Sequence, residues 1–140
     1  MARDVVAGPV PGIPGAHALT HILVVSDVAT SRDWYRSVLG ADVYREYGSS
    51  AVLEVLGTWL LLVTAGGPTP DKPGVSFLEP REPDVVAHAI TIRVDDCMVA
   101  YQELSGRGAG FLTPPVDRSG EVRCFFRDPD GHLFELSEAR

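Results

Sequence analysis

Glu135 is an acidic residue in an apolar run close to the C-terminal end of this sequence, Leu133-Phe134-Glu135-Leu136. An acid inside an apolar strand must be ionised against a partner, bound to a metal ion, or protonated. Each alternative gives the side chain a different chemistry: an ion pair, a metal ligand, or a proton donor. Glu135 is therefore the first candidate for a functional residue.

A dense turn sequence directly precedes this acid. The run Asp128-Pro129-Asp130-Gly131 combines the fixed φ of proline, Asp side chains that bond to nearby amides, and a glycine that accepts positive φ. The chain is predicted to reverse there and to join a strand at 122–126 to a strand at 133–137 as an antiparallel hairpin. His132, at the end of the turn, is expected to be an exposed turn residue.

The elements that must position this hairpin follow a pattern that occurs twice. The first copy has a predicted strand at 19–25, an amphipathic helix at 30–39 capped by Thr30 or Ser31 and ended by Gly40, and strands at 42–47, 51–55 and 58–64. The second has a strand at 88–94, a helix that begins at Asp95 and Asp96 and ends at Gly108, and strands at 111–112, 122–126 and 133–137. Asp27 and Gly40 recur as Asp95 and Gly108, in both cases 68 residues later.

This repeat predicts an α+β fold in which two βαβββ modules pair into a curved, partly open β-barrel cup. Each module alone would leave one sheet face bare, and pairing covers it. One domain is expected over 17–140, with module 1 at about 17–66, a Pro-rich and Gly-rich linker at 67–84 that includes a brief edge strand at Val75 to Leu78, and module 2 at about 85–138. Residues 1–16 are expected to form a flexible arm.

Composition excludes several classes of function. The chain has 140 residues and a formal net charge of −7, which makes a nucleic-acid surface improbable because phosphate binding needs clustered Lys and Arg. No apolar run is long enough to span a bilayer, and the N-terminal segment lacks the apolar centre of a signal peptide. A cytoplasmic protein is expected, with Cys97 and Cys124 as buried, reduced thiols.

The motifs resemble those of the vicinal oxygen chelate superfamily, which contains glyoxalase I, bleomycin-resistance proteins, fosfomycin-resistance enzymes and extradiol dioxygenases. The resemblance covers about residues 19–138 and rests on Asp27, Trp34-Tyr35, Val38-Leu39-Gly40, Val94-Asp95-Asp96, Asp128-Pro129-Asp130-Gly131 and Phe134-Glu135-Leu136. It implies the cup fold. It does not select an activity, because this scaffold carries many chemistries.

In metal-using members, the ligands come from the first strand of each module and from the last strand. The resemblance places Glu135 in the position of the final carboxylate, with His21 and His88 as the nearest histidines, whereas Leu60 and Leu62 occupy the region of a fourth ligand. Two imidazoles and one carboxylate form a facial triad that favours Fe(II), with Mn(II), Ni(II) or Zn(II) as alternatives. Glu135 would then be a metal ligand that doubles as a proton shuttle.

The register of the two first strands works against this triad. The usual ligand positions are those of Thr20 and Ala89, each one residue away from a histidine, and neighbouring strand residues face opposite sides. Simple alternation directs Thr20, Ile22 and Val24 of the first strand, and Ala89, Thr91 and Arg93 of the second, into the cup. His21 and His88 would face the helices unless a β-bulge in each strand restored them.

Two functions follow, and the sequence does not choose between them. The first is a divalent-metal-dependent enzyme acting on a small oxygenated substrate, either a lyase or isomerase or an extradiol-type dioxygenase. The second is a metal-free protein of the bleomycin-resistance kind that sequesters a small molecule, in which Glu135 is paired with Arg93 or Arg123. Candidate ligand-contacting residues are Thr20, Trp59, Thr91, Arg93 and Arg123. The resemblance further implies a homodimer whose two chains complete each cup.

Overall fold

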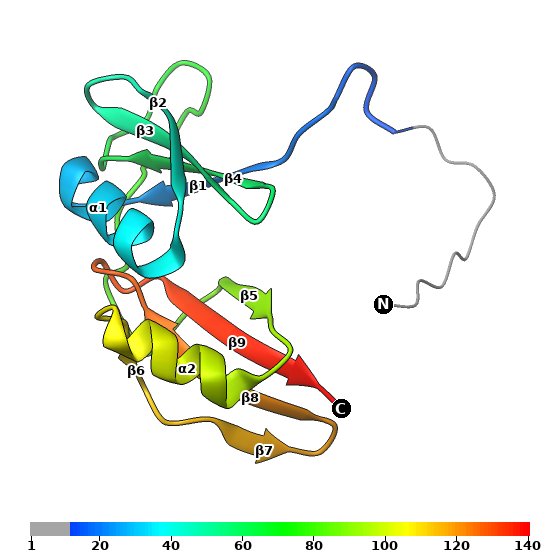
Figure 1. Cartoon of the computed structure of the whole chain (residues 1–140). Helices are drawn as coiled ribbons and strands as arrows, with labels where there is room; N and C mark the ends of the chain where they lie inside the picture. Colours follow the sequence, from blue (N-terminus) through cyan, green and yellow to red (C-terminus); the bar gives the residue numbers. More distant parts are fainter. Residues whose placement is uncertain (1–11) are drawn as a thin grey trace.

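The computed structural model describes residues 12–140, which contain two similar successions of elements, the second with one additional strand, β7 (Figure 1). The first copy consists of β1 (Thr20–Val24), α1 (Val28–Leu39), β2 (Asp42–Glu46), β3 (Ser50–Val55) and β4 (Thr58–Val63). The second consists of β5 (Ala89–Arg93), α2 (Cys97–Gly106), β6 (Gly110–Phe111), β7 (Val116–Arg118), β8 (Glu121–Arg127) and β9 (Leu133–Ala139). Residues 1–11 of the predicted arm lie outside the described range, and residues 12–19 are exposed.

Each copy forms its own sheet. The first sheet has the order β1-β4-β3-β2, and the second has the order β5-β9-β8-β6 with β7 added to β8. The first strand of each module pairs in parallel with the last, and the remaining pairs are antiparallel. Within the described range neither sheet closes on itself, so β1 and β5 remain edge strands of an open, curved cup. The predicted α+β fold of two modules is confirmed.

Helix α1 begins at Val28, before the predicted start at residue 30, because Asp27 caps it. The Asp27 carboxylate accepts hydrogen bonds from the Ala29 amide at 3.1 Å and from the Thr30 hydroxyl at 2.9 Å. These bonds satisfy donors that the first turn of a helix leaves unpaired. The prediction of Thr30 or Ser31 as the cap is therefore wrong. Gly40 ends the helix in the left-handed conformation, with a φ of 67°, as expected.

The helices cover one side of each sheet, and the side chains beneath them form a single core. Every second residue of the strands points into this core, and the helices add their buried residues to it. The core includes Leu23, Val25, Tyr35, Val38, Leu53, Leu60 and Leu62 from module 1 and Cys97, Leu104, Cys124, Phe126, Phe134 and Leu136 from module 2. The alternate residues lie on the opposite side, which we call the helix-free face. On module 1 this face carries Thr20, Ile22, Tyr44, Glu54 and Trp59; on module 2 it carries Thr91, Arg93, Glu121, Arg123, Phe125, Glu135 and Ser137.

A buried carboxylate, Asp128, joins the two modules. It accepts a hydrogen bond of 2.7 Å from the Tyr35 hydroxyl of α1, and its other oxygen accepts the backbone amides of Asp130 and His132 at 2.9 and 2.8 Å. Tyr35 is completely buried and Asp128 nearly so. Burial raises the pKa of the Asp128 carboxyl above its ordinary value of 3.8, and these donors oppose the shift.

The same turn makes two further contacts with module 1. Asp130 accepts a hydrogen bond of 2.9 Å from the Ser26 amide and one of 3.3 Å from the Ser31 hydroxyl. The His132 Nε2 lies 2.7 Å from the Val24 carbonyl oxygen and donates to it. The prediction of His132 as an exposed turn residue is wrong, because its ring reaches the end of β1. The turn of module 2 thus holds both β1 and α1 of module 1.

The long connection between β4 and β5 differs from its prediction. In place of the expected edge strand at Val75 to Leu78, Phe77 forms only an isolated bridge with Gly66. Proline lacks the amide that a ladder needs, and this segment is rich in proline. Strand β7 was not predicted, because its residues are all exposed and show no alternation. Neither of the two helices in residues 12–140 has the length and hydropathy needed to cross a membrane.

Replacing Tyr35 by Phe tests the link between the modules. The Tyr35→Phe variant loses the hydroxyl that donates to buried Asp128, so its free energy of unfolding is expected to fall by about 1.5 to 3 kcal/mol in urea denaturation. The pKa of Asp128 is higher in the folded state than its ordinary value of 3.8. Ionisation of Asp128 therefore lowers the stability of the fold as the pH rises from about 3.8 through the folded-state pKa. The defect of the variant is therefore expected to be larger at neutral pH than in acid.

Tyr101 provides the matched control. Its ring packs edge-to-face on Phe111 at 4.8 Å, and among the described residues its hydroxyl has no hydrogen-bond partner. Tyr101→Phe should leave the unfolding free energy nearly unchanged. Equal effects of the two substitutions, or a Tyr35→Phe defect that does not vary with pH, would contradict the role assigned to Asp128.

Candidate functional site

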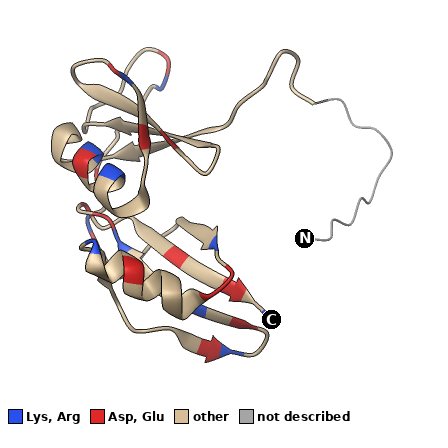
Figure 2. Ribbon diagram, in the orientation of Figure 1, with Lys and Arg blue, Asp and Glu red and all other residues tan. Residues whose placement is uncertain are grey.

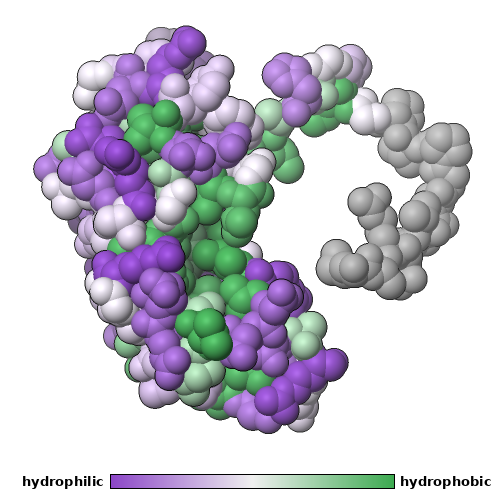
Figure 3. Space-filling model, in the orientation of Figure 1, coloured by the Kyte–Doolittle hydropathy of each residue, from purple (hydrophilic) through white to green (hydrophobic). Residues whose placement is uncertain are grey.

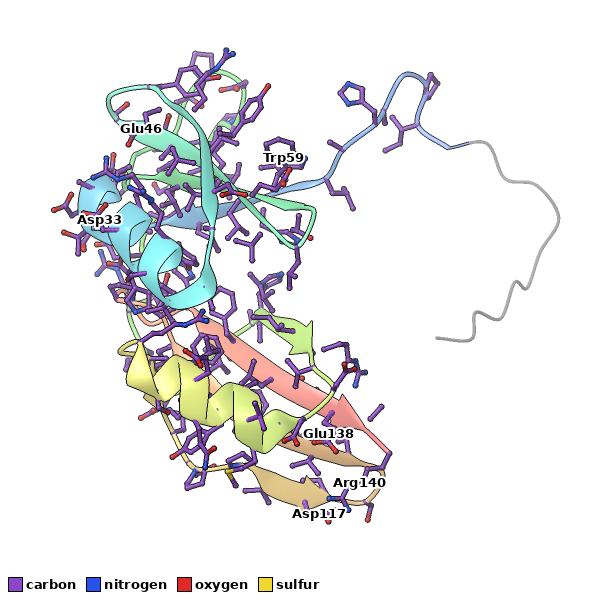
Figure 4. The ribbon with its side chains drawn as sticks, viewed as in Figure 1. Asp33, Glu46, Trp59, Asp117, Glu138 and Arg140 are labelled. Carbon is purple, nitrogen blue, oxygen red and sulfur yellow. The ribbon has the colours of Figure 1, made fainter. Side chains whose placement is uncertain are left out.

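The helix-free face of module 1 combines an aromatic pair with a carboxylate, Glu54, which lies opposite Trp59 in the pairing of β3 with β4. Trp59 of β4 packs edge-to-face against Tyr44 of β2, with 4.8 Å between ring centroids, and Figure 4 shows Trp59 projecting from the first sheet on the side away from α1. Thr20 lies opposite Trp59 in the pairing of β1 with β4, and the next residue of β1 on this face, Ile22, is half exposed. This arrangement places the aromatic surface between a hydroxyl, that of Thr20, and a carboxylate, that of Glu54.

The helix-free face of module 2 is polar, and Glu135 is paired there. Its Oε1 accepts a hydrogen bond of 2.7 Å from the Thr91 hydroxyl, and its Oε2 lies 3.9 Å from Nη1 of Arg123. The Arg123 guanidinium also lies over the ring of Phe125, 5.5 Å from its centroid. The side chain of Glu135 is 13% exposed, so the paired acid still borders the open face.

A second carboxylate, Glu121, extends this network. It accepts a hydrogen bond of 2.7 Å from the Ser137 hydroxyl and lies 3.4 Å from Arg123 and 3.9 Å from Arg93. The Ser137 hydrogen bond, followed by the two arginines, holds the pKa of Glu121 below its ordinary value of 4.5. Arg93 donates to Ser137 at 2.8 Å, and its side chain is 62% exposed, which leaves donors free for a ligand.

The two faces differ in how their charges are arranged. Figure 2 shows acidic and basic segments side by side on the strands of the second sheet, whereas β1 and β4 carry neither and the charges of the first sheet lie on β2 and β3. Glu121 and Ser137 were not among the predicted site residues, although each lies two positions from a residue that was, and alternation would have identified them. Tyr44 was missed as well, because its contact with Trp59 depends on strand pairing that the sequence does not specify.

The two candidate metal-binding histidines lie together, at the beginning of β1 and just before β5. The ring centroids of His21 and His88 are 5.7 Å apart. In β1, the side chain of His21 points to the opposite side of the sheet from exposed Thr20 and to the same side as buried Leu23. His88 immediately precedes β5 and is exposed. The strand alternation of β1 thus directs the His21 imidazole to the side opposite Thr20.

The strands that carry these residues contain no bulge that would redirect them. The pairings of β1 with β4 and of β5 with β9 run without a change of register, so Thr20 and Ala89 keep their places on the helix-free face. In the part of the chain that the structure describes, no three His, Cys, Asp or Glu side chains are grouped so as to hold a metal ion. The residues present in one chain therefore do not fit a triad of two histidines and Glu135.

Two cavities lie where the modules meet. One of about 240 Å³ is bordered by Thr91 and Arg93, and its neighbour of about 320 Å³ shares Arg93. Their remaining walls are mainly apolar and include Leu39, Val55, Leu56 and Ile92. Figure 3 shows a hydrophobic surface between the two halves of the molecule. The most exposed arginine of the polar network thus also borders apolar space.

The sequence profile of the Glyoxalase/Bleomycin resistance protein/Dioxygenase superfamily matches residues 16–136, which is most of the chain. The chain belongs to this superfamily. A glutathione transferase FosA from Serratia marcescens is 28% identical over 120 residues, which cover 85% of this chain and 79% of that protein.

Solved structures of proteins of similar length share the fold. TnmS3, an antibiotic binding protein from Streptomyces sp. CB03234, superposes with a TM-score of 0.65 at 20% identity, covering 92% of this chain and 100% of its own. The fosfomycin resistance protein FosX from Listeria monocytogenes, solved with Mn(II) and sulfate, gives a TM-score of 0.62 at 16% identity, covering 92% and 93%. At such identities the likeness concerns the fold alone.

Ser137 provides a test of the polar network. In Ser137→Ala the main hydrogen bond to Glu121 is lost, so the pKa of Glu121 should rise toward 4.5, as measured by an NMR titration of its carboxyl carbon. Because the pKa of Glu121 is lower in the folded state than in the unfolded state, its ionisation stabilises the fold at a pH above the unfolded-state pKa. This stabilisation is lost as the pH falls through the folded-state pKa. The variant should therefore lose less stability than the parent on acidification below pH 4.5.

Ser119→Ala, on the exposed β7–β8 turn, is the control. If Ser137→Ala leaves the titration of Glu121 unchanged, the network is not the cause of the low pKa of Glu121.

Proposed function

We propose that this protein binds a small molecule on its helix-free faces without a metal ion. The observation that carries the proposal is the unbroken register of β1 and β5. It supports Thr20 and Ala89, the usual ligand positions, as residues of these faces and His21 as a residue of the other side. What remains on the faces is a set of groups suited to non-covalent recognition.

The chemistry of the two faces indicates the kind of ligand. Trp59 and Tyr44 supply an aromatic surface, which favours a planar, apolar ring system. On module 2 both carboxylates are already engaged, and Arg93 is the charged group with donors to spare. An oxygen-rich or anionic substituent therefore suits this face better than a cation, despite the net charge of −7.

Anilinonaphthalene sulfonate, a planar aromatic anion whose fluorescence rises in apolar surroundings, is a direct probe. Protein stripped with a chelator is expected to bind it saturably, and the affinity should not change when divalent metal is added back. Trp59→Ala removes most of the aromatic surface and should weaken binding about tenfold, equivalent to about 1.4 kcal/mol. Val99→Ala, an exposed apolar truncation on α2, is the control and should bind like the parent.

A divalent-metal-dependent enzyme is the second candidate, with His21, His88 and Glu135 as ligands and Glu135 as the proton-transferring group. It is favoured by the adjacency of the two imidazoles and by the relative that is a glutathione transferase. The same samples separate the two candidates. The enzyme requires near-stoichiometric Fe(II), Mn(II), Ni(II) or Zn(II) in protein purified without a nickel column, lowered by His88→Ala and by Glu135→Gln. Metal-free binding requires all three proteins to hold only traces.

We further propose that the protein functions in the cytoplasm as a homodimer in which a second copy completes each cup. The unpaired edges of β1 and β5 and the apolar residues near them, such as Ile22 and Leu56, are exposed in the single chain. Light scattering should give twice the chain mass of 15.1 kDa at micromolar concentration. A mass of one chain would require the site to be built from a single copy.

A further inference from the structure

Cys97 and Cys124 form a buried pair of free thiols that the proposed binding site does not use. Cys97 is the first residue of α2, and Cys124 lies in the middle of β8, 27 positions further along the chain. Their Sγ atoms are 3.7 Å apart, which is van der Waals contact between sulfurs, and the two residues are 0% and 1% exposed. Two elements that are distant in sequence thus bring two thiols together.

The surroundings hold these thiols in place. The Cys97 amide donates to Glu138 of β9 at 2.8 Å, and the Cys97 sulfur lies 3.8 Å from the Leu136 carbonyl oxygen. Figure 4 shows Glu138 on β9 beside the start of α2. The two sulfurs need to approach by roughly 1.7 Å to reach the bond length of a disulfide, a movement of the size that side-chain rotation provides. The first turn of α2 therefore needs no large displacement for a bond to form.

We propose that Cys97 and Cys124 are a redox site that a hydroperoxide converts into a reversible disulfide between α2 and β8. A thiolate of Cys97 attacks one peroxide oxygen, the O–O bond breaks, and the departing hydroxide takes up the thiol proton as water. The sulfur of Cys124 then displaces hydroxide from the resulting sulfenic acid, and the second water leaves. Two thiols lose two electrons and two protons, and one hydrogen peroxide becomes two waters.

The order of the two sulfurs follows from their positions. Burial raises the pKa of both thiols, that of Cys124 to about 12. Cys97 is the first residue of α2, which opening of the first turn exposes, whereas Cys124 lies in the middle of β8, so Cys97 is the attacking residue. Because both thiols are buried, oxidation requires the first turn of α2 to open and is slower than that of an exposed thiol.

The bond would connect α2 to the strand that carries part of the ligand-facing network. Cys124 lies between Arg123 and Phe125, whose side chains point to the helix-free face. A covalent tie at this position restricts the unfolded chain and fastens the helix to β8. The oxidised protein is therefore expected to melt at a higher temperature than the reduced protein.

Peptide mapping of the full chain tests the proposal. The reduced protein is treated with hydrogen peroxide, quenched, unfolded, alkylated with iodoacetamide and digested with trypsin without a reductant. Cleavage at the flanking arginines gives peptides 94–107 and 124–127, each with one cysteine. The expected product is the linked pair, about 2 Da lighter than the two free peptides together and separated by dithiothreitol.

Two internal controls make the result decisive. Met98, which is 44% exposed and lies in the same peptide as Cys97, reports that peroxide reached this region by its conversion to the sulfoxide. In Cys124→Ser the link cannot form, and Cys97 should accumulate as a sulfenic acid that dimedone traps. Alkylated Cys97 and Cys124 persisting in the parent after Met98 is fully oxidised would overturn the proposal, as would linked chains in place of a linked monomer. An oxidised monomer that melts no higher than the reduced one would overturn the proposed fastening of α2.

Discussion

The carboxylate of Asp128 is buried where the two modules meet, and its need for hydrogen-bond donors constrains the rest of the structure. A carboxylate removed from water is costly unless donors replace its hydration. The Tyr35 hydroxyl comes from module 1, and the two backbone amides come from the turn of module 2. These donors are available together only when α1 and the turn are docked in one orientation. The buried acid therefore acts as a specificity device for pairing the modules.

This constraint reaches the candidate site through the strand that follows the turn. His132 and Asp130 attach the turn to Val24 and Ser26, at the end of β1, and β9 leaves the turn toward β5. The position of β9 then sets Glu135 beside Thr91, and β8 brings Arg123 to the same carboxylate. The polar network of the helix-free face is thus fixed by contacts on the opposite side of the sheet. The helix-facing side specifies the fold, and the helix-free side is the one on which we propose that a ligand binds.

Much of the fold follows from local sequence signals. The recurrence of an aspartate and a glycine at a constant offset identifies two modules, and period-two alternation assigns the faces of β1 and β5 correctly. The parts that escaped prediction depend on contacts between distant residues. Tyr35 and Asp128 are 93 positions apart, and His132 and Val24 are 108 apart, so neither contact leaves a local pattern. Glu135 was identified because an acid in an apolar run is anomalous, whereas Tyr44 has no such anomaly.

The central claim is that the helix-free faces bind a small aromatic ligand without metal. Mapping anilinonaphthalene sulfonate on chelator-treated protein by amide and indole NMR shifts is its most direct test. The account predicts saturable shifts of the Trp59 indole and of the amides of Thr91, Arg93 and Arg123, with those of α1 and α2 unmoved. Shifts that appear only after Mn(II) or Zn(II) is added, or that centre on His21 and His88, would contradict it.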